Sequence, residues 1–227
     1  MQNKPITWKR MPSQGIVVIT GARGEGKSAL AWWLAQEIQG NTKKQVVALN
    51  VPSPAQGAFP RQGFGKGGIK YINEVEDIED LKPSIIVIDE ATFVLNARRA
   101  MSENNIMWME LAAVCRHKDH LLVFICQSTR QIDIQLLAEA DYVIMKRPTM
   151  QHMRTCRKEF EPELRQAWDQ FSAMRTNTKK KAYVVDYNNG NATMLISRMP
   201  TWWNDKVSKA YASVEFSSKR RKKNEGK

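Results

Sequence analysis

Apolar residues run continuously through several short stretches of the chain instead of alternating with polar ones. Four such stretches are IVVIT (16–20), QVVALN (45–50), SIIVIDE (84–90) and LLVFICQ (121–127), and a weaker fifth is DYVIMKR (141–147). Strands buried on both faces of a parallel sheet have this continuous pattern. Helical stretches lie between them at 27–39, 103–117 and 134–140. The alternation predicts an α/β fold, with a mostly parallel sheet of five or more strands flanked by helices and joined by right-handed crossovers.

The pattern changes after residue 148. A helical stretch at 161–175 is followed by KKKAYVVDYNNGNATMLIS (179–197), which predicts a β-hairpin turning around 188–190. A short helix is expected at 204–213, and the end of the chain lacks the apolar residues needed to fold. We therefore expect a core at 1–148, a C-terminal extension of helix, hairpin and helix at 149–216 that is integrated with the core, and a basic disordered tail at 217–227.

Segment 52–68 fits neither pattern. It contains three prolines and five glycines, a composition that predicts a long mobile loop. Its basic residues Arg61 and Lys66, together with Lys70 just beyond it, leave three interpretations open: contact with DNA, movement as a lid, or a disordered loop without either role. The pair Trp202-Trp203 could stack on a base or fill a gap in the core, and the core is favoured.

The length of 227 residues suits one α/β domain with some decoration. The longest apolar run, LLVFIC (121–126), is far shorter than the roughly eighteen residues of a membrane helix, and the first residues have no signal-peptide core. The three cysteines are not paired in a ligand-like way, which favours a reducing, cytosolic interior. A metal cluster of Cys115, His117 and His120 is the less favoured interpretation, because zinc sites have clearer paired spacings.

The net charge of +12 is concentrated in the last third of the chain. Residues 1–145 contain 16 Lys and Arg against 15 Asp and Glu, whereas residues 146–181 contain 10 against 4 and the tail 219–227 contains 6 against 1. Clustered basic residues displace counterions from a phosphate backbone, so this asymmetry favours a nucleic-acid partner. The alternative is a solvated basic face with a disordered tail.

The sequence GARGEGKS (21–28) follows the first strand, opens a helix and matches the phosphate-binding pattern G-x-x-x-x-G-K-[ST] in full. Glycines let the backbone N–H groups turn inward around a phosphate at the positive end of the helix. Lys27 is expected to reach the β- and γ-phosphates, and the Ser28 hydroxyl to bind Mg²⁺. The residues expected to bind ATP are Gly21, Ala22, Arg23, Gly24, Glu25, Gly26, Lys27 and Ser28.

Two further strand ends have the polar residues that such a site needs. Asp89, after IIVI, is expected to hold Mg²⁺, and the adjacent Glu90 to polarise the attacking water, which favours hydrolysis over phosphoryl transfer. Gln127 ends the next apolar strand, so it would lie between the two motifs and could sense the γ-phosphate or position water.

An arginine offered by a neighbouring subunit could stabilise the charge of the transition state. Arg116, at the end of the helix before the strand 121–127, is the first candidate. The rivals are Arg98, Arg99, Arg130 and Arg147.

Taken together, GARGEGKS, IIVIDEATF, LLVFICQSTRQID and a strand ending in KRP resemble the FtsK–HerA superfamily of P-loop motors over roughly residues 14–148. Within it, the chain is most similar to the genome-packaging ATPases of tectivirus-type icosahedral viruses that contain a membrane. The resemblance implies a RecA-like core, a homo-oligomeric ring at a portal vertex bound to viral portal or capsid proteins, and ATP-driven translocation of double-stranded DNA into a procapsid. It also implies that the protein is found in the host cytoplasm and the virion, without inserting into a membrane.

The same residues leave other functions open. RHKDHLLVFICQSTRQID also resembles the Zot-type ATPases that extrude filamentous phages, although those commonly carry a membrane segment. A third possibility is a nucleotide-gated adaptor, in which ATP binding orders a surface for a partner protein and the chain is not a motor.

Overall fold

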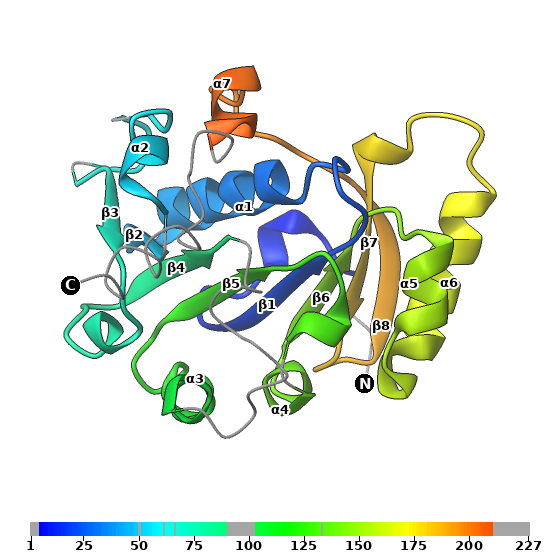
Figure 1. Ribbon diagram of the computed structural model, residues 1–227, viewed down its shortest axis with the longest axis horizontal. Helices are drawn as coiled ribbons and strands as arrows, with labels where there is room; N and C mark the ends of the chain where they lie inside the picture. Colours follow the sequence, from blue (N-terminus) through cyan, green and yellow to red (C-terminus); the bar gives the residue numbers. More distant parts are fainter. Residues whose placement is uncertain are drawn as a thin grey trace, which may run out of the picture.

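One eight-stranded sheet organises the protein, with the order β3-β2-β4-β5-β1-β6-β7-β8 (Figure 1). The computed structural model describes residues 5–49, 51–60, 62–65, 67–89, 103–132 and 134–210, without the side chains of 103–107 and 131. Strands β1 to β6 pair in parallel, and β7 and β8 are antiparallel. The predicted parallel α/β fold is thereby confirmed. The strands are β1 (Gly15–Thr20), β2 (Gln45–Leu49), β3 (Ile69–Ile72), β4 (Ser84–Ile88), β5 (Leu121–Ile125), β6 (Tyr142–Met145), β7 (Lys181–Asp186) and β8 (Asn191–Ile196).

Helices cover both faces of the sheet (Figure 1). One face packs against α1 (Lys27–Thr42), α2 (Ser53–Gln56) and α7 (Asp205–Ser208), and the other against α3 (Glu103–Val114), α4 (Ile134–Ala138), α5 (Met150–Thr155) and α6 (Glu161–Ser172). Short 3-10 helices occur at Trp8–Arg10, Glu76–Ile78, Thr129–Gln131, Lys158–Phe160 and Thr178–Lys180. None of the helices in the described part of the chain is long and apolar enough to cross a membrane.

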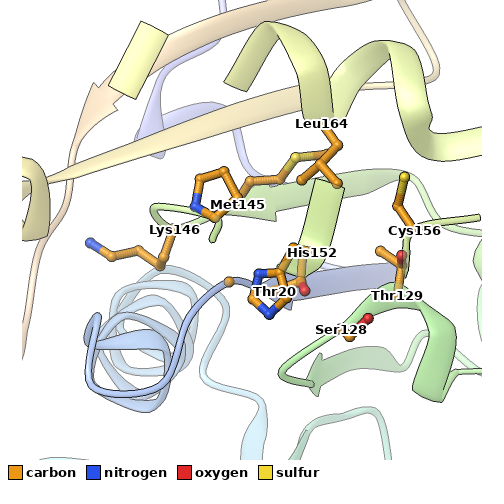
Figure 2. A pocket seen from close by; sticks show the side chains of 10 residues that line it. Thr20, Ser128, Thr129, Met145, Lys146, His152, Cys156 and Leu164 are labelled. Carbon is orange, nitrogen blue, oxygen red and sulfur yellow. The ribbon is translucent and has the colours of Figure 1, made fainter. Parts of the chain in front are cut away.

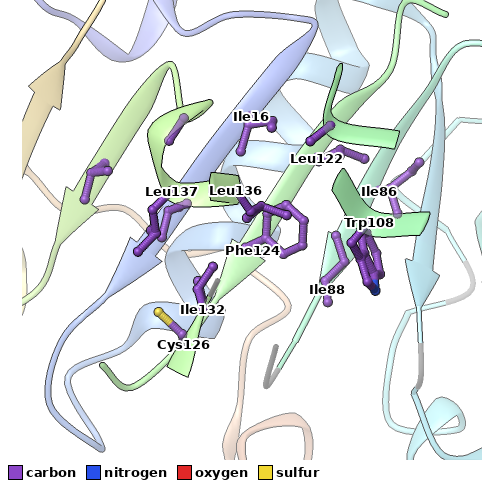
Figure 3. Packing of buried hydrophobic residues seen from close by; sticks show 14 of the residues in the cluster. Ile16, Ile86, Ile88, Trp108, Leu122, Phe124, Cys126, Ile132, Leu136 and Leu137 are labelled. Carbon is purple, nitrogen blue, oxygen red and sulfur yellow. The ribbon is translucent and has the colours of Figure 1, made fainter. Parts of the chain in front are cut away.

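The continuous apolar runs are explained by the two helical layers. Within β1, Val17 and Ile19 belong to the cluster under α1, whereas Ile16 and Val18 belong to the cluster under α3 to α6. On that second face, Trp108 packs edge-on against Phe124, with ring centroids 5.3 Å apart (Figure 3). Full burial of a large apolar side chain contributes about 1.5–3 kcal/mol to the free energy of folding. Apolar residues on both faces of the central strands therefore stabilise the sheet.

The region 52–72 differs from its prediction. Strand β3 follows the glycine-rich segment and pairs with β2. It escaped sequence reasoning because its four residues, IKYI, form no continuous buried run, and only Ile72 is buried. The segment itself contains α2 and is anchored by Phe59 and Phe64, which are buried against Trp32 with centroids 5.0 and 6.0 Å from it. The described part is therefore packed onto α1, and Arg61 and Lys66 lie outside the described residues.

The predicted hairpin forms, and it extends the main sheet. Strand β7 pairs with β6 from Tyr142↔Asp186 to Met145↔Tyr183, and β8 pairs with β7. The hairpin turn lies at 187–190, as expected. Because the first residues of β7 lie beside the last residues of β6, the hairpin begins at the edge of the sheet where the parallel strands end. The boundaries of the three predicted parts stay predictions, and the tail 217–227 lies outside the described residues.

Candidate functional site

The phosphate-loop, aspartate and glutamine motifs all follow parallel strands and therefore meet at one edge of the sheet, which we call the carboxyl edge. Strand β1 precedes GARGEGKS and pairs with β5, and β5 in turn pairs with β4, which precedes Asp89. Gln127 follows β5, so it lies between the other two motifs, where the sequence predicts it. Ligands of open α/β sheets bind beyond this edge.

The loop 21–28 has the backbone of a phosphate cradle. Gly24 and Gly26 have φ angles of 77° and 83°, and a Cβ atom at either would meet nothing within 4 Å. The loop therefore needs glycine there for its left-handed turns, not for space. The Lys27 ammonium lies inside the loop, where Nζ donates to the carbonyl oxygens of Gly21 and Ala22 at 2.9 and 3.0 Å.

The two expected magnesium ligands are adjacent. Ser28 Oγ donates to Asp89 Oδ1 at 3.1 Å, although the two residues are 61 positions apart in sequence. A hydroxyl and a carboxylate at the N-terminus of a helix are oxygen donors of the kind that Mg²⁺ takes alongside phosphate oxygens. The residues present thus fit the ion. Glu90, the predicted base, lies outside the described residues.

The candidate arginines are distributed over the whole fold. Arg130 and Arg147 are exposed near the carboxyl edge, and the Arg147 carbonyl accepts a hydrogen bond from Ala22 N in the phosphate loop at 3.1 Å. Arg98 and Arg99 lie outside the described residues.

Arg116 lies at the opposite, amino edge of the sheet. Its guanidinium pairs with Asp141, the residue before β6, while the side chain stays 48% exposed. Asp141 is buried and also accepts from the backbone N–H of Ile16 at 2.8 Å and from Asn188 Nδ2 at 2.9 Å. Arg116 is therefore remote from the phosphate loop of its own chain, and its action on a neighbouring subunit stays a prediction.

Sequence reasoning missed Lys146, a buried lysine at the end of β6. Its side chain donates to the carbonyls of Lys179 and Lys181 at 2.6 and 2.7 Å, which fixes the start of β7 to the carboxyl edge. Burial lowers the pKa of Lys146 to about 8, against an opposing effect of the Glu25 charge in the phosphate loop. The chain turns so tightly here that a Cβ on Gly21 would lie 2.7 Å from the Lys146 carbonyl oxygen.

A second missed residue is His152, on α5. It lines a pocket beside the phosphate loop, together with Thr20, Gly21, Ser128 and Thr129 (Figure 2). Burial, and then the nearby Lys27 charge, lower the pKa of His152. The sequence offered one signal, since a threonine three residues before a polar residue is the pattern of a helix cap.

Basic residues of the extension also gather at the carboxyl edge. Lys179 and Lys180 precede β7, and Arg198 follows β8, whose end is fixed there by a bond of 2.8 Å from Ser197 N to the Lys180 carbonyl. All three side chains are exposed, as is that of Arg147. We call Arg147, Lys179, Lys180 and Arg198 the basic edge.

Two alternatives from the sequence are resolved within the described residues. No group of three metal-binding side chains occurs among them, so Cys115, His117 and His120 do not form a metal cluster. Trp202 packs on Phe59 and Phe64, with centroids 6.4 and 5.8 Å away, as expected of a core residue.

The parallel sheet, the phosphate loop and the Ser28–Asp89 pair together define a P-loop nucleoside triphosphatase. Residues 17–148, more than half of the chain, match the family model for the ATPase family associated with various cellular activities (AAA). The chain belongs to this family. No curated protein matches the chain.

Solved structures with a similar fold include viral packaging enzymes. The genome-packaging NTPase B204 from Sulfolobus turreted icosahedral virus 2, in complex with ATP-gammaS, aligns with a TM-score of 0.60 and 15% identity, over 81% of this chain and 97% of that one. B204, the DNA-packaging ATPase from Sulfolobus turreted icosahedral virus, aligns with a TM-score of 0.56 and 14% identity, over 79% of this chain and 96% of that one. The resemblance to genome-packaging ATPases is confirmed at the level of the fold. The N-terminal domain of the Neisseria meningitidis zonular occludens toxin aligns with a TM-score of only 0.45 and 15% identity, over 90% of this chain and 100% of that one.

Proposed function

We propose that this P-loop ATPase is a motor that hydrolyses ATP to move double-stranded DNA into a viral procapsid. It works as a homo-oligomeric ring bound to portal-vertex or capsid proteins, in the host cytoplasm and on the virion. The similar fold of the packaging enzymes supports this proposal. Within the chain itself, the observation that carries it is the basic edge, which lies at the same edge of the sheet as the phosphate loop.

The hydrolytic half of the proposal assigns roles to residues of the carboxyl edge. Lys27 binds the β- and γ-phosphates, and Ser28 with Asp89 holds Mg²⁺, which when bound neutralises phosphate charge. Gln127 orients the attacking water or senses the terminal phosphate, and Glu90 accepts the proton of that water.

The DNA half depends on charge placed close to the nucleotide. Arg147 joins the phosphate loop to the basic edge, because its own carbonyl accepts from Ala22 N. Lys146 fixes the backbone that carries Lys179 and Lys180. A change in the loop on ATP turnover therefore has a short covalent and hydrogen-bonded route to the residues that would contact the DNA backbone.

The first experiment measures ATP turnover with and without duplex DNA. We expect DNA to raise turnover, Lys27→Ala to abolish it, and Glu90→Gln to retain ATP binding while losing hydrolysis. Unchanged biological function in Glu90→Gln would favour the nucleotide-gated adaptor instead. Recovery of the protein in a membrane complex with coat protein would favour filamentous-phage extrusion.

The second experiment measures DNA affinity against salt concentration. The double variant Lys179→Gln/Lys180→Gln removes two exposed positive charges. The logarithm of the DNA-binding constant falls as the logarithm of salt concentration rises, and we expect this slope to be less steep by about 2 in the double variant. The matched control is Lys82→Gln/Lys118→Gln, which removes two exposed lysines near the amino edge. Equal slopes for the two double variants would contradict the assignment of DNA to the basic edge.

A further inference from the structure

The imidazole of His152 is held by one of its two nitrogens. The backbone N–H of Thr149 donates to Nδ1 at 3.4 Å, and the backbone N–H of His152 donates to Thr149 Oγ1 at 3.3 Å. These two bonds form a capping box at the N-terminus of α5. A neutral imidazole whose Nδ1 accepts carries its proton on Nε2. His152 therefore has an N–H donor whose orientation is fixed by the helix cap.

The residues around this donor belong to the nucleotide site. The pocket that His152 lines includes Thr20 and Gly21 at the start of the phosphate loop, and Ser128 and Thr129 directly after Gln127 (Figure 2). The Lys27 charge is close enough to His152 to lower the pKa of the imidazole. The pocket thus lies at the junction of β1, β5 and β6, on the face of the sheet opposite α1.

The chain after α5 is attached to the same junction. Arg157 Nη2 donates to the Ile132 carbonyl at 2.9 Å, and its Nε donates to the Thr129 carbonyl at 3.5 Å. Upstream of α5, the Arg147 carbonyl accepts from Ala22 in the phosphate loop. Helix α5 is consequently connected to the phosphate loop on one side and to the segment after Gln127 on the other.

From these contacts we propose that His152 is a further phosphate-binding residue, whose Nε2–H donates to the terminal phosphate of a nucleoside triphosphate held by the phosphate loop. The bond exists with a triphosphate and is absent with a diphosphate. Because the same ring caps α5 through Nδ1, this helix, which carries the exposed Arg154 and leads to the exposed Lys158, responds to which nucleotide is bound. The inference rests on the nucleotide-binding half of the proposed function and is independent of DNA.

Two substitutions differ in whether they keep the donor of the ring. His152→Asn places an amide oxygen near the position of Nδ1, so it keeps the cap and removes the donor. His152→Gln places an amide N–H near Nε2, so it keeps a donor, and glutamine is itself a capping residue at this third position of a helix. His117→Asn is the matched control, because His117 is exposed and lies beyond α3, at the other edge of the sheet.

The experiment measures the affinities of ATPγS and ADP, each with Mg²⁺, together with the melting temperature. We expect His152→Asn to weaken ATPγS about tenfold relative to ADP, as for loss of one charge-assisted hydrogen bond, with a melting temperature close to that of the wild type. We expect His152→Gln to retain most of the ATPγS preference, with a melting temperature also close to that of the wild type. The control variant should match the wild type in both measurements.

An unchanged ratio of affinities in His152→Asn overturns the proposal. Equal weakening of both nucleotides, or the same loss of preference in the Asn and Gln variants, overturns it as well. A wild-type protein that binds neither nucleotide would overturn the ATPase function together with this inference, whereas failure to bind DNA would contradict the motor function and leave the His152 proposal standing.

Discussion

At the scale of single residues, the buried His120 shows how one side chain can make stability depend on pH. The ring is fully buried between β4 and β5, where Nδ1 accepts from the backbone N–H of Ser84 at 3.2 Å. Its Nε2 has no hydrogen-bond partner among the described residues. Burial is the largest cause that lowers the pKa of His120, and the charges of Lys118 and Lys44 lower it further. The folded protein therefore holds His120 neutral.

We expect the free energy of unfolding to fall as the pH drops below about 6.5, the pKa of an unperturbed histidine. The unfolded chain then binds a proton that the folded chain resists, so the contribution is complete above 6.5 and is lost between that value and the lower folded pKa. Urea unfolding at pH 7.5 and pH 5.5 measures this difference. His120→Asn keeps an acceptor for the Ser84 N–H, and its free energy of unfolding should change less between the two pH values than that of the wild type. His117→Asn should show the same change as the wild type. A difference as large in His120→Asn as in the wild type would assign the effect to other groups.

At the scale of elements, prediction succeeded where a pattern is local and failed where contacts are distant. Five parallel strands were predicted because a short, continuous apolar run is typical of a strand buried on both faces. Strand β3 was missed because Lys70 and its half-exposed neighbours resemble a loop. The hairpin was predicted from its own turn, but its pairing with β6 depends on the register of Tyr142 with Asp186, which no local pattern contains.

The candidate site divides in the same way. The loop around Lys27 and the aspartate after β4 belong to compact motifs, so their meeting at one edge follows from the parallel direction of the strands that precede them. The positions of Arg116 and His152 depend instead on contacts made after folding, such as the ion pair with Asp141, 25 residues away. Sequence reasoning could name Arg116 as a candidate, but it could not place it at the amino edge.

Two glycines of the phosphate loop should tolerate a methyl group differently. Gly21 has φ 138°, and a Cβ there would lie 2.7–2.9 Å from the backbone and Cβ of Lys146. We expect Gly21→Ala to separate the loop from β6 and to abolish ATP binding. Gly24→Ala meets no atom within 4 Å and has only the left-handed φ of 77° to overcome, a cost of about 1–2 kcal/mol.

Calorimetric titration with ATPγS, beside thermal melting, compares the two alanine variants of the loop. Gly24→Ala should retain measurable binding, and the melting temperature of Gly21→Ala should fall further. An equal loss of ATPγS binding and of melting temperature in both variants would mean that the left-handed backbone conformation, and not the contact with Lys146, makes glycine necessary in the loop.

At the scale of the whole molecule, the two edges of the sheet have different chemistry. The carboxyl edge contains the phosphate loop and the basic edge, and the amino edge contains the buried Asp141 with Arg116 and Asn188 around it. In a head-to-tail ring each copy presents different surfaces to its two neighbours. Such a ring could bring the amino edge of one copy to the nucleotide of the next. Arg116 is half-exposed and carries five N–H donors, of which the ion pair with Asp141 uses only part.

Mixing two inactive variants tests whether one copy completes the site of another. Lys27→Ala lacks a working phosphate loop, and Arg116→Ala lacks the arginine. If Arg116 acts in trans, random mixing at equal amounts joins an intact loop to an intact arginine at about a quarter of the interfaces, because each has a one-half chance of being intact. We expect ATP turnover of about that fraction of the wild type, from two proteins that are each inactive alone. Asp141→Asn is the control, since it weakens the ion pair and keeps Arg116, and it should lower the melting temperature while retaining turnover. If the mixture stays inactive and Asp141→Asn behaves like Arg116→Ala, the arginine serves the fold of its own chain.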